Sequence, residues 1–227
     1  MLDCLRVYVP PAPKMRIGSP DGDGGYVVID LPDAKYDVLI AGGVADQVNF
    51  EDTFLDRWNV PCYAYDGTIN DKFPVTKHPI TFVGKNIGPV ETATETNLHH
   101  LFDAHEHIFV KMDIEGAEYP WFASLDDAKL EKIEQMVVEL HPVHHVEQLN
   151  RLAKTHWLVH VHANNYGGMM QVNGMILPTV FECTFIRKKA GEQLELNTEP
   201  FPTDLDRPNA CDRPDYTLDG YPFVHKK

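Results

Sequence analysis

Three acids follow an apolar, β-branched run between residues 109 and 118, and residues of this type in this position could carry chemistry. Asp113 ends the run, and Glu115 and Glu118 follow on either side of Gly116. In an open α/β sheet, ligands bind in the crevice outside the carboxyl ends of the strands, so acids placed there point at a ligand. The plainer interpretation is a strand end capped by acids, with Glu118 complementing the first turn of a helix.

Two later apolar runs end in the same way. Glu139 and His141 follow the run at 135–138, and His162 closes the run that starts at 157, just before two asparagines. Because a doubly wound sheet gathers the carboxyl ends of its strands along one edge, we expect these groups to converge with Asp113.

Such a set suits two chemistries, which do not exclude each other. In the first, His141 takes the proton of an alcohol as general base, and a carboxylate orients it. In the second, Asp113, Glu139 and His141 bind a divalent cation such as Mg²⁺ or Mn²⁺, which acidifies a coordinated hydroxyl. The simpler explanation of His141 is a bond to backbone at a strand end, and that of His144 and His145 is exposure at a helix start.

The first half of the chain has the layout by which α/β folds hold a nucleoside. Its parts are, in order, a strand at 36–40, a turn with Gly42, Gly43 and Asp46, a helix at 49–59, and a strand at 61–65 that ends on Asp66. Asp66 lies 23 residues after Gly43, close to the spacing of about 20 at which an acid takes the ribose hydroxyls. The full G-x-G-x-x-G pattern is missing, so a dinucleotide is not favoured.

A glycine-rich stretch around Asp23 and Gly25 precedes a short strand at 26–29. It fits a plain hairpin turn and equally a loop whose backbone lies against a ligand.

The pattern of apolar runs predicts an α/β fold with a doubly wound, Rossmann-like sheet of seven mostly parallel strands and helices on both faces. The strands are expected at 36–40, 61–65, 80–83, 107–112, 135–138, 157–162 and 179–186, and the helices at 49–59, 91–105, 118–133 and 146–156. We expect a single domain over 1–227, with a proline-rich, extended lead-in at 1–20 and a wrapping tail at 188–227.

The composition and net charge limit the kinds of molecule that this protein can bind. The chain has 20 Lys and Arg against 34 Asp and Glu residues, a net charge of −14, and such a surface repels nucleic acids and anionic bilayers. The four cysteines form no C-x-x-C pair, which is typical of free thiols in a reducing compartment. No basic start precedes a long apolar run. We therefore expect a soluble, cytoplasmic protein that binds neither nucleic acid nor membrane.

With these residues in view, the chain resembles the FkbM-type methyltransferases, which depend on S-adenosylmethionine. The motif that carries the resemblance is Lys111-Met-Asp-Ile-Glu-Gly-Ala-Glu118. Further support comes from Asp23-Gly-Gly-Tyr-Val27, Phe50-Glu51, Asp66, Glu139-Leu-His141, His162-Ala-Asn-Asn165 and Phe181-Glu-Cys-Thr-Phe-Ile-Arg187. The resemblance extends over most of the chain, from about residue 16 to residue 187.

The resemblance implies a class I methyltransferase fold and transfer of a methyl group to a hydroxyl, commonly on a sugar, a glycan or a secondary metabolite. It implies that Gly25, Gly42, Gly43, Asp46, Glu51 and Asp66 bind the cofactor. Asp113 and His141 are expected beside the acceptor hydroxyl, with Glu115, Glu139 and His162 in support. One departure is the family's D-x-G-A-N-x-G turn, which this chain replaces with Ala41-Gly-Gly-Val-Ala-Asp46.

Two other functions fit the same residues. A nicotinamide-dependent oxidoreductase acting on a sugar nucleotide would use Asp66 equally well. A non-catalytic module would keep the nucleoside pocket and transfer nothing, although the polar strand ends count against it.

Overall fold

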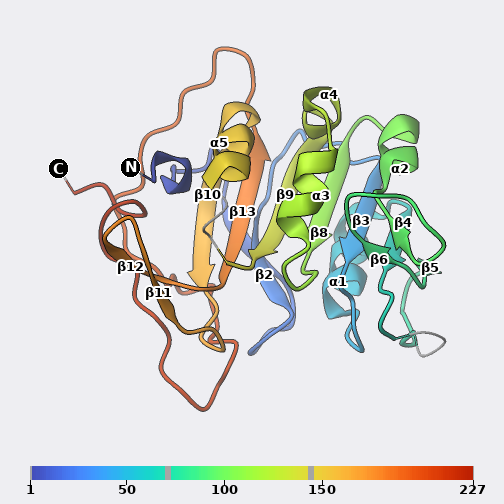
Figure 1. The fold of residues 1–227 in the computed structure, drawn as a ribbon, viewed down its shortest axis with the longest axis horizontal. Helices are drawn as coiled ribbons and strands as arrows, with labels where there is room; N and C mark the ends of the chain where they lie inside the picture. Colours follow the sequence, from blue (N-terminus) through green and yellow to red (C-terminus); the bar gives the residue numbers. More distant parts are fainter. Residues whose placement is uncertain (1, 70–72, 143–145, 227) are drawn as a thin grey trace.

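One mixed β-sheet of seven strands forms the centre of the protein. A computed structural model describes residues 2–69, 73–142 and 146–226. The strands of the sheet are β3 (Val38–Gly42), β4 (Cys62–Tyr65), β5 (Thr81–Val83), β8 (Ile108–Met112), β9 (Ile133–Leu140), β10 (His156–Ala163) and β13 (Phe181–Arg187). Their order is β10, β13, β9, β8, β3, β4, β5 (Figure 1). Neighbours from β9 to β5 pair in parallel, and β13 is antiparallel to both β9 and β10. The predicted α/β fold with a seven-stranded sheet is confirmed.

Both faces of this sheet are covered. The covering elements are α1 (Asn49–Trp58), α2 (His99–Ala104), α3 (Glu118–Ser124), α5 (Val146–Thr155) and the antiparallel hairpin of β1 (Lys14–Gly18) and β2 (Gly25–Ile29). Successive strand residues point to opposite faces. Leu39 and Phe109 therefore pack with α1 and the hairpin, whereas Ile40 and Val110 pack in the layer that contains α2, α3 and α5.

Helix α1 forms where the sequence predicts it because its apolar residues share one face. Phe50 and Phe54 are one turn apart and buried, and Phe50 meets Tyr26 of the hairpin edge to face, with ring centroids 5.6 Å apart. The helix ends at Asn59, which adopts a left-handed conformation with φ of 40°, a common way to terminate a helix.

The N-terminal segment differs from the expected extended lead-in. Asp3–Leu5 form a short 3-10 helix, and β1 occupies the end of the segment. Leu5 and Val7 are buried in the main hydrophobic core, so apolar side chains fix this segment against the sheet. The glycine-rich stretch joins β1 to β2 and is the hairpin turn that was one of its two interpretations.

Two predicted helices are wrong in extent. Residues 91–105 form a helix only at α2, because the Thr92 hydroxyl accepts hydrogen bonds from the N–H groups of Thr94 and Glu95, a local turn that competes with helix. This turn lies between two short strands, β6 (Asn86–Ile87) and β7 (Glu95–Thr96). The helix expected at 118–133 is split into α3 and α4 (Asp127–Leu130), because the Asp126 side chain caps α4 by accepting from the Lys129 N–H.

The last part of the chain packs along the β10 side of the sheet. A second hairpin, β11 (Met169–Val172) with β12 (Met175–Pro178), follows β10 and turns at Asn173 and Gly174. In Figure 1 the orange to red segment after β13 runs around this side of the molecule, and isolated bridges join Tyr8 to Leu196 and Phe201 to Leu218. None of the helices in the described ranges is long and apolar enough to cross a bilayer.

Candidate active site

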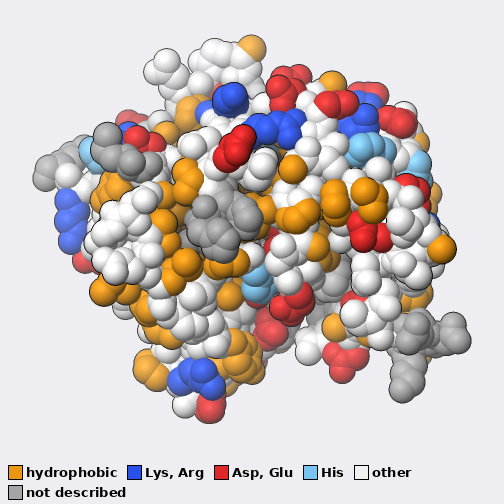
Figure 2. All heavy atoms as spheres, in the orientation of Figure 1, with side chains coloured by type: hydrophobic (Ala, Val, Ile, Leu, Met, Phe, Trp, Pro, Cys, Tyr) orange, Lys and Arg blue, Asp and Glu red, His pale blue; other side chains and the backbone are white. Residues whose placement is uncertain are grey.

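Two adjoining cavities lie at the carboxyl ends of the central strands. The larger has a volume of about 680 Å³ and the smaller about 90 Å³. Gly43, Ala45 and Asp113 line both, so the two spaces meet where β3 and β8 end. In Figure 2, acidic side chains and a histidine gather beside a notch at the lower edge of the molecule, the edge to which the arrowheads of β9 and β10 point in Figure 1.

Asp66 lies in the wall of the larger cavity, directly after β4. Its carboxylate accepts hydrogen bonds from the Ala45 N–H at 2.9 Å and from the Thr68 N–H and hydroxyl at 2.7 and 2.6 Å. Burial raises the pKa of Asp66, but these hydrogen bonds outweigh it and hold the pKa below its ordinary value. Asp66 is therefore an ionised acceptor that ties the glycine turn to the end of β4.

The glycines predicted to bind cofactor occupy different places. Gly43 has a positive φ of 69° and no room for a side chain, because a Cβ there would collide with the carbonyl oxygen of Asp113. Gly42 lies outside both cavities and packs against Ile87 and Met112. Gly25 also lies outside them.

The hairpin reaches the smaller cavity through residues next to Gly25. Asp23 and Gly24 line it, together with Asp46 and Glu51 from the other side. The hairpin turn therefore also borders the candidate site.

Asp113, Glu139 and His141 converge as predicted, with one ligand atom from each lying within 4.8 Å of the others. Tyr26 donates its hydroxyl to Asp113 Oδ2 at 3.3 Å, while Asp113 Oδ1 is buried and has no hydrogen-bond partner in the described structure. Burial raises the pKa of Asp113. Burial also raises the pKa of Glu139 to about 7, although the hydrogen bond with His141 opposes this rise.

His141 is held by carboxylates on both sides of its ring. Nδ1 lies 3.2 Å from Glu118 Oε1, and Nε2 lies 3.0 Å from Glu139 Oε1. Burial lowers the pKa of His141, but the hydrogen bonds with Glu118 and Glu139 outweigh it and raise the pKa to about 10. In this state His141 is an imidazolium that donates from both nitrogens, so it has no free position with which to accept a proton.

Glu118 shapes the turn that presents this histidine. It is fully buried, and its Oε1 also accepts from the N–H groups of Ile114 and Gly116. The turn needs these bonds because Glu115 and Gly116 both have positive φ. Glu115 itself lines the larger cavity, with its side chain 87% exposed and its Oε2 3.8 Å from His141 Nε2. Sequence reasoning placed Glu118 either among acids that point at a ligand or in the first turn of a helix, and it missed this contact.

His162 lies outside the cluster of Asp113, Glu139 and His141. Its Nδ1 is 2.9 Å from Glu182 Oε2, and its Nε2 is 2.9 Å from Asp215 Oδ2 in the C-terminal segment. Glu182 pairs in register with both Glu139 and His162, so it separates the two. His162 is buried in this ion network and does not line either cavity. Sequence reasoning missed Glu182, because its position depends on the register of β13.

The cluster of Asp113, Glu139 and His141 fits a divalent cation by donor type. It offers two carboxylate oxygens and one imidazole nitrogen, a set that suits Mn²⁺ or Mg²⁺. The partnerless Asp113 Oδ1 could be satisfied by such an ion. A second group, Asp23, Glu139 and Glu182, also has ligand atoms within 4.8 Å of one another. His144 and His145 lie outside the described residues.

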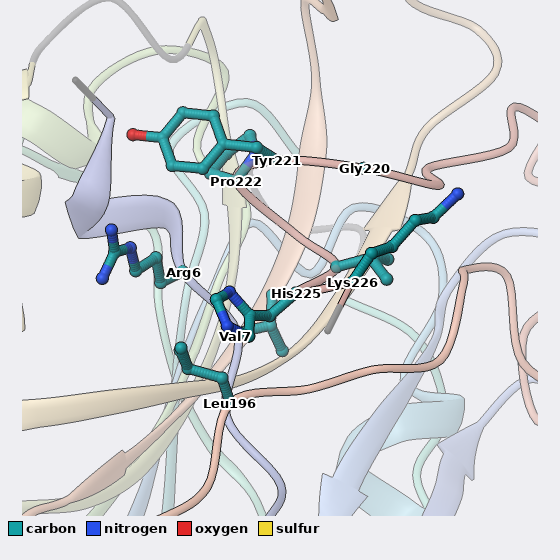
Figure 3. Close-up of a pocket in the computed structure, with 9 residues that line it drawn as sticks. Arg6, Val7, Leu196, Gly220, Tyr221, Pro222, His225 and Lys226 are labelled. Atoms are coloured by element: carbon teal, nitrogen blue, oxygen red, sulfur yellow. The ribbon is translucent and has the colours of Figure 1, made fainter.

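A third cavity, of about 280 Å³, lies between the chain termini and lacks the carboxylates that line the two cavities at the strand ends. Figure 3 shows Arg6 and Lys226 in its wall with their charged ends directed away from each other. The described residues around it include no carboxylate. We therefore place the candidate site at the strand ends.

Comparison with known proteins identifies the family of the chain. The model of the methyltransferase FkbM domain matches residues 20–194. The chain belongs to the FkbM methyltransferase family. No curated protein and no solved structure matches it. The predicted resemblance is confirmed, and the family match favours methyl transfer over the nicotinamide-dependent oxidoreductase.

Proposed function

We propose that this FkbM family member transfers the methyl group of S-adenosylmethionine to a hydroxyl of a sugar, a glycan or a sugar-bearing metabolite. The observation that carries the proposal is the adjoining pair of cavities, which have Asp66 at one end and the cluster of Asp113, Glu139 and His141 beside their junction. The proposal includes a doubly wound class I arrangement, which the strand order and the covered faces support.

The larger cavity suits the nucleoside of the donor. Its volume of about 680 Å³ lies within the range of roughly 300–1,000 Å³ found for small-molecule sites. The ionised Asp66 can accept hydrogen bonds from ribose hydroxyls. Gly43 belongs to the wall of this cavity, and its missing side chain leaves room for the carbonyl oxygen of Asp113, which keeps the ends of β3 and β8 close together.

Methyl transfer to an oxygen is an in-line displacement: the oxygen–carbon bond forms, the carbon–sulfur bond breaks, and the hydroxyl proton goes to a base. Alignment of the two reactants supplies much of the rate effect. Because His141 is already protonated, we assign proton transfer to the pair Asp113 and Glu139, with His141 orienting Glu139. The pKa of about 7 at Glu139 suits a base that works near neutral pH.

A divalent cation would be held by Asp113, Glu139 and His141 and would lower the pKa of the acceptor hydroxyl. His141 would first release a proton, because an imidazolium cannot be a ligand. Activity after chelation, and after addition of Mg²⁺ or Mn²⁺, tests this part of the proposal.

The carboxylates at the strand ends also bear on the acceptor. They accept hydrogen bonds from hydroxyl groups and repel phosphorylated or carboxylated compounds. A neutral, hydroxyl-rich acceptor is therefore favoured, in agreement with a sugar.

Calorimetric titration with S-adenosylhomocysteine and with NAD tests the donor. We expect binding of the first and none of the second, and the reverse result would contradict the proposal. His141→Ala should lower turnover far more than it lowers affinity for S-adenosylhomocysteine. Unchanged turnover would remove His141 from the mechanism.

A further inference from the structure

A second group of carboxylates lies beside the cluster of Asp113, Glu139 and His141. Asp23 comes from the turn between β1 and β2, Glu139 from β9 and Glu182 from β13, and one oxygen of each lies within 4.8 Å of the others. Glu139 and Glu182 pair in register on neighbouring strands and are only 5% and 6% exposed. Carboxylates this close repel one another, and burial strengthens the repulsion because little water screens it. The group therefore favours a positive charge.

Asn209 adds a buried oxygen to this group from the C-terminal segment. It is 4% exposed, and its Nδ2 donates to Asp23 Oδ1 at 3.1 Å and to Glu182 Oε1 at 2.6 Å. Its Oδ1 is buried and has no hydrogen-bond partner in the part of the chain that the structure describes. Because an amide is neutral, its two hydrogen bonds leave the negative charge of the carboxylates in place. The amide oxygen itself is a good ligand for a hard cation.

We infer that Asp23, Glu139, Glu182 and Asn209 form a binding site for a calcium ion. All four donors are oxygens, and Ca²⁺ takes carboxylate and amide oxygens in irregular arrangements. A half-turn of the Asn209 amide about its Cβ–Cγ bond exchanges Nδ2 for Oδ1, so that an oxygen faces the ion. The inference does not depend on methyl transfer. Asn209 also lies beyond residues 20–194, which match the family domain.

This site differs in chemistry from the neighbouring cluster of Asp113, Glu139 and His141, with which it shares only Glu139. The neighbouring cluster includes an imidazole, which suits Mn²⁺ better than Ca²⁺, and His141 Nε2 already lies 3.0 Å from Glu139 Oε1. Asp23 is exposed, so an ion can reach the second group from solvent. Ca²⁺ should therefore select the second group.

An ion at this site would join the β1–β2 turn, β9, β13 and the C-terminal segment. That segment is already tied to the same edge of the sheet, because Asp215 pairs with His162 and the Asn165 side chain donates to the carbonyl oxygen of Ala210. Binding to the folded state alone raises stability. Ca²⁺ should therefore raise the midpoint of thermal unfolding of the wild type.

Calorimetric titration of the metal-free protein with CaCl₂, in the absence of a methyl donor, tests the inference. Asp23→Asn removes a charge from this group, Asp113→Asn removes one from the neighbouring cluster, and Asp21→Asn removes an exposed carboxylate from the same turn as Asp23. Asp23→Asn should weaken Ca²⁺ binding about tenfold or more, whereas the other two variants should change it by less than about threefold.

Asn209→Asp shows whether Asn209 is a ligand or only a hydrogen-bond donor. A fourth carboxylate should strengthen Ca²⁺ binding if this side chain faces the ion, whereas loss of a donor to two acids would weaken it. Thermal unfolding without Ca²⁺ shows whether the variant is folded, and we expect a lower midpoint than that of the wild type because the added charge is repelled.

Three results would overturn the inference. One is an Asp23→Asn protein that binds Ca²⁺ as tightly as Asp21→Asn. The second is an Asp113→Asn protein that binds Ca²⁺ more weakly than Asp23→Asn, which would assign the ion to the neighbouring cluster. The third is a wild type that binds S-adenosylhomocysteine but no Ca²⁺, and the proposed function would then stand without this site.

Discussion

Replacement of Gly43 by alanine tests whether the ends of β3 and β8 close on each other as the structure shows. The added Cβ would collide with the carbonyl oxygen of Asp113, and Gly43 has a φ of 69°. A left-handed conformation costs a residue with a Cβ about 1–2 kcal/mol, and overpacking costs about 1–3 kcal/mol. Gly43→Ala should therefore lower the free energy of unfolding by about 2–5 kcal/mol. Gly168→Ala is the matched control, because its Cβ would meet nothing within 4 Å.

Urea denaturation of both variants measures this difference, and titration with S-adenosylhomocysteine measures its consequence for binding. Because Asp113 and Gly43 both line the junction of the two cavities, relief of the collision must move a wall of the site, and binding should be lost with stability. If Gly43→Ala were as stable as Gly168→Ala, to within about 0.5 kcal/mol, the close approach of these strand ends would be refuted.

Three further changes follow from the site. Glu118→Gln should lower the pKa of His141 from about 10, because it removes one of the two carboxylates that hold the ring. Glu115→Gln removes an exposed carboxylate and should leave this pKa nearly unchanged. Histidine NMR titration measures both variants, and equal effects would contradict the distinction between the buried and the exposed carboxylate. Burial lowers the pKa of His162, but its carboxylate partners outweigh this and raise it to about 10, so its contribution to stability is complete below pH 6.5 and is lost as the pH rises through about 10. His162→Gln should flatten the fall in unfolding free energy over this range, and an unchanged slope in urea denaturation would argue against the ion network. Asp66→Asn should weaken binding of S-adenosylhomocysteine by about tenfold or more, and calorimetry that showed full affinity would remove Asp66 from the nucleoside site.

The sequence predicts the strand ends well because burial on both faces imposes long apolar runs. The run before Asp113 and the run before Glu139 are both buried strands of the sheet, and their parallel pairing brings the two acids together. This part of the site follows from local pattern and one topological rule.

Other contacts join residues that are far apart in the chain, and no local sequence pattern predicts them. Asp215 pairs with His162 from 53 residues away, and Glu182 reaches Glu139 only through the register of β13. The helix expected at 91–105 does not form over its full length for a different reason: the Thr92 hydroxyl accepts hydrogen bonds from backbone N–H groups and so stabilises a turn. Where side chains compete with the backbone, propensity alone is insufficient.

A crystal structure of the complex with S-adenosylhomocysteine tests the central claim most directly. The ribose hydroxyls should lie within hydrogen-bond distance of Asp66, and the sulfur should face Asp113 and the adjoining Glu139 and His141. A nucleoside bound away from Asp66, or a sulfur directed away from this cluster, would contradict the account.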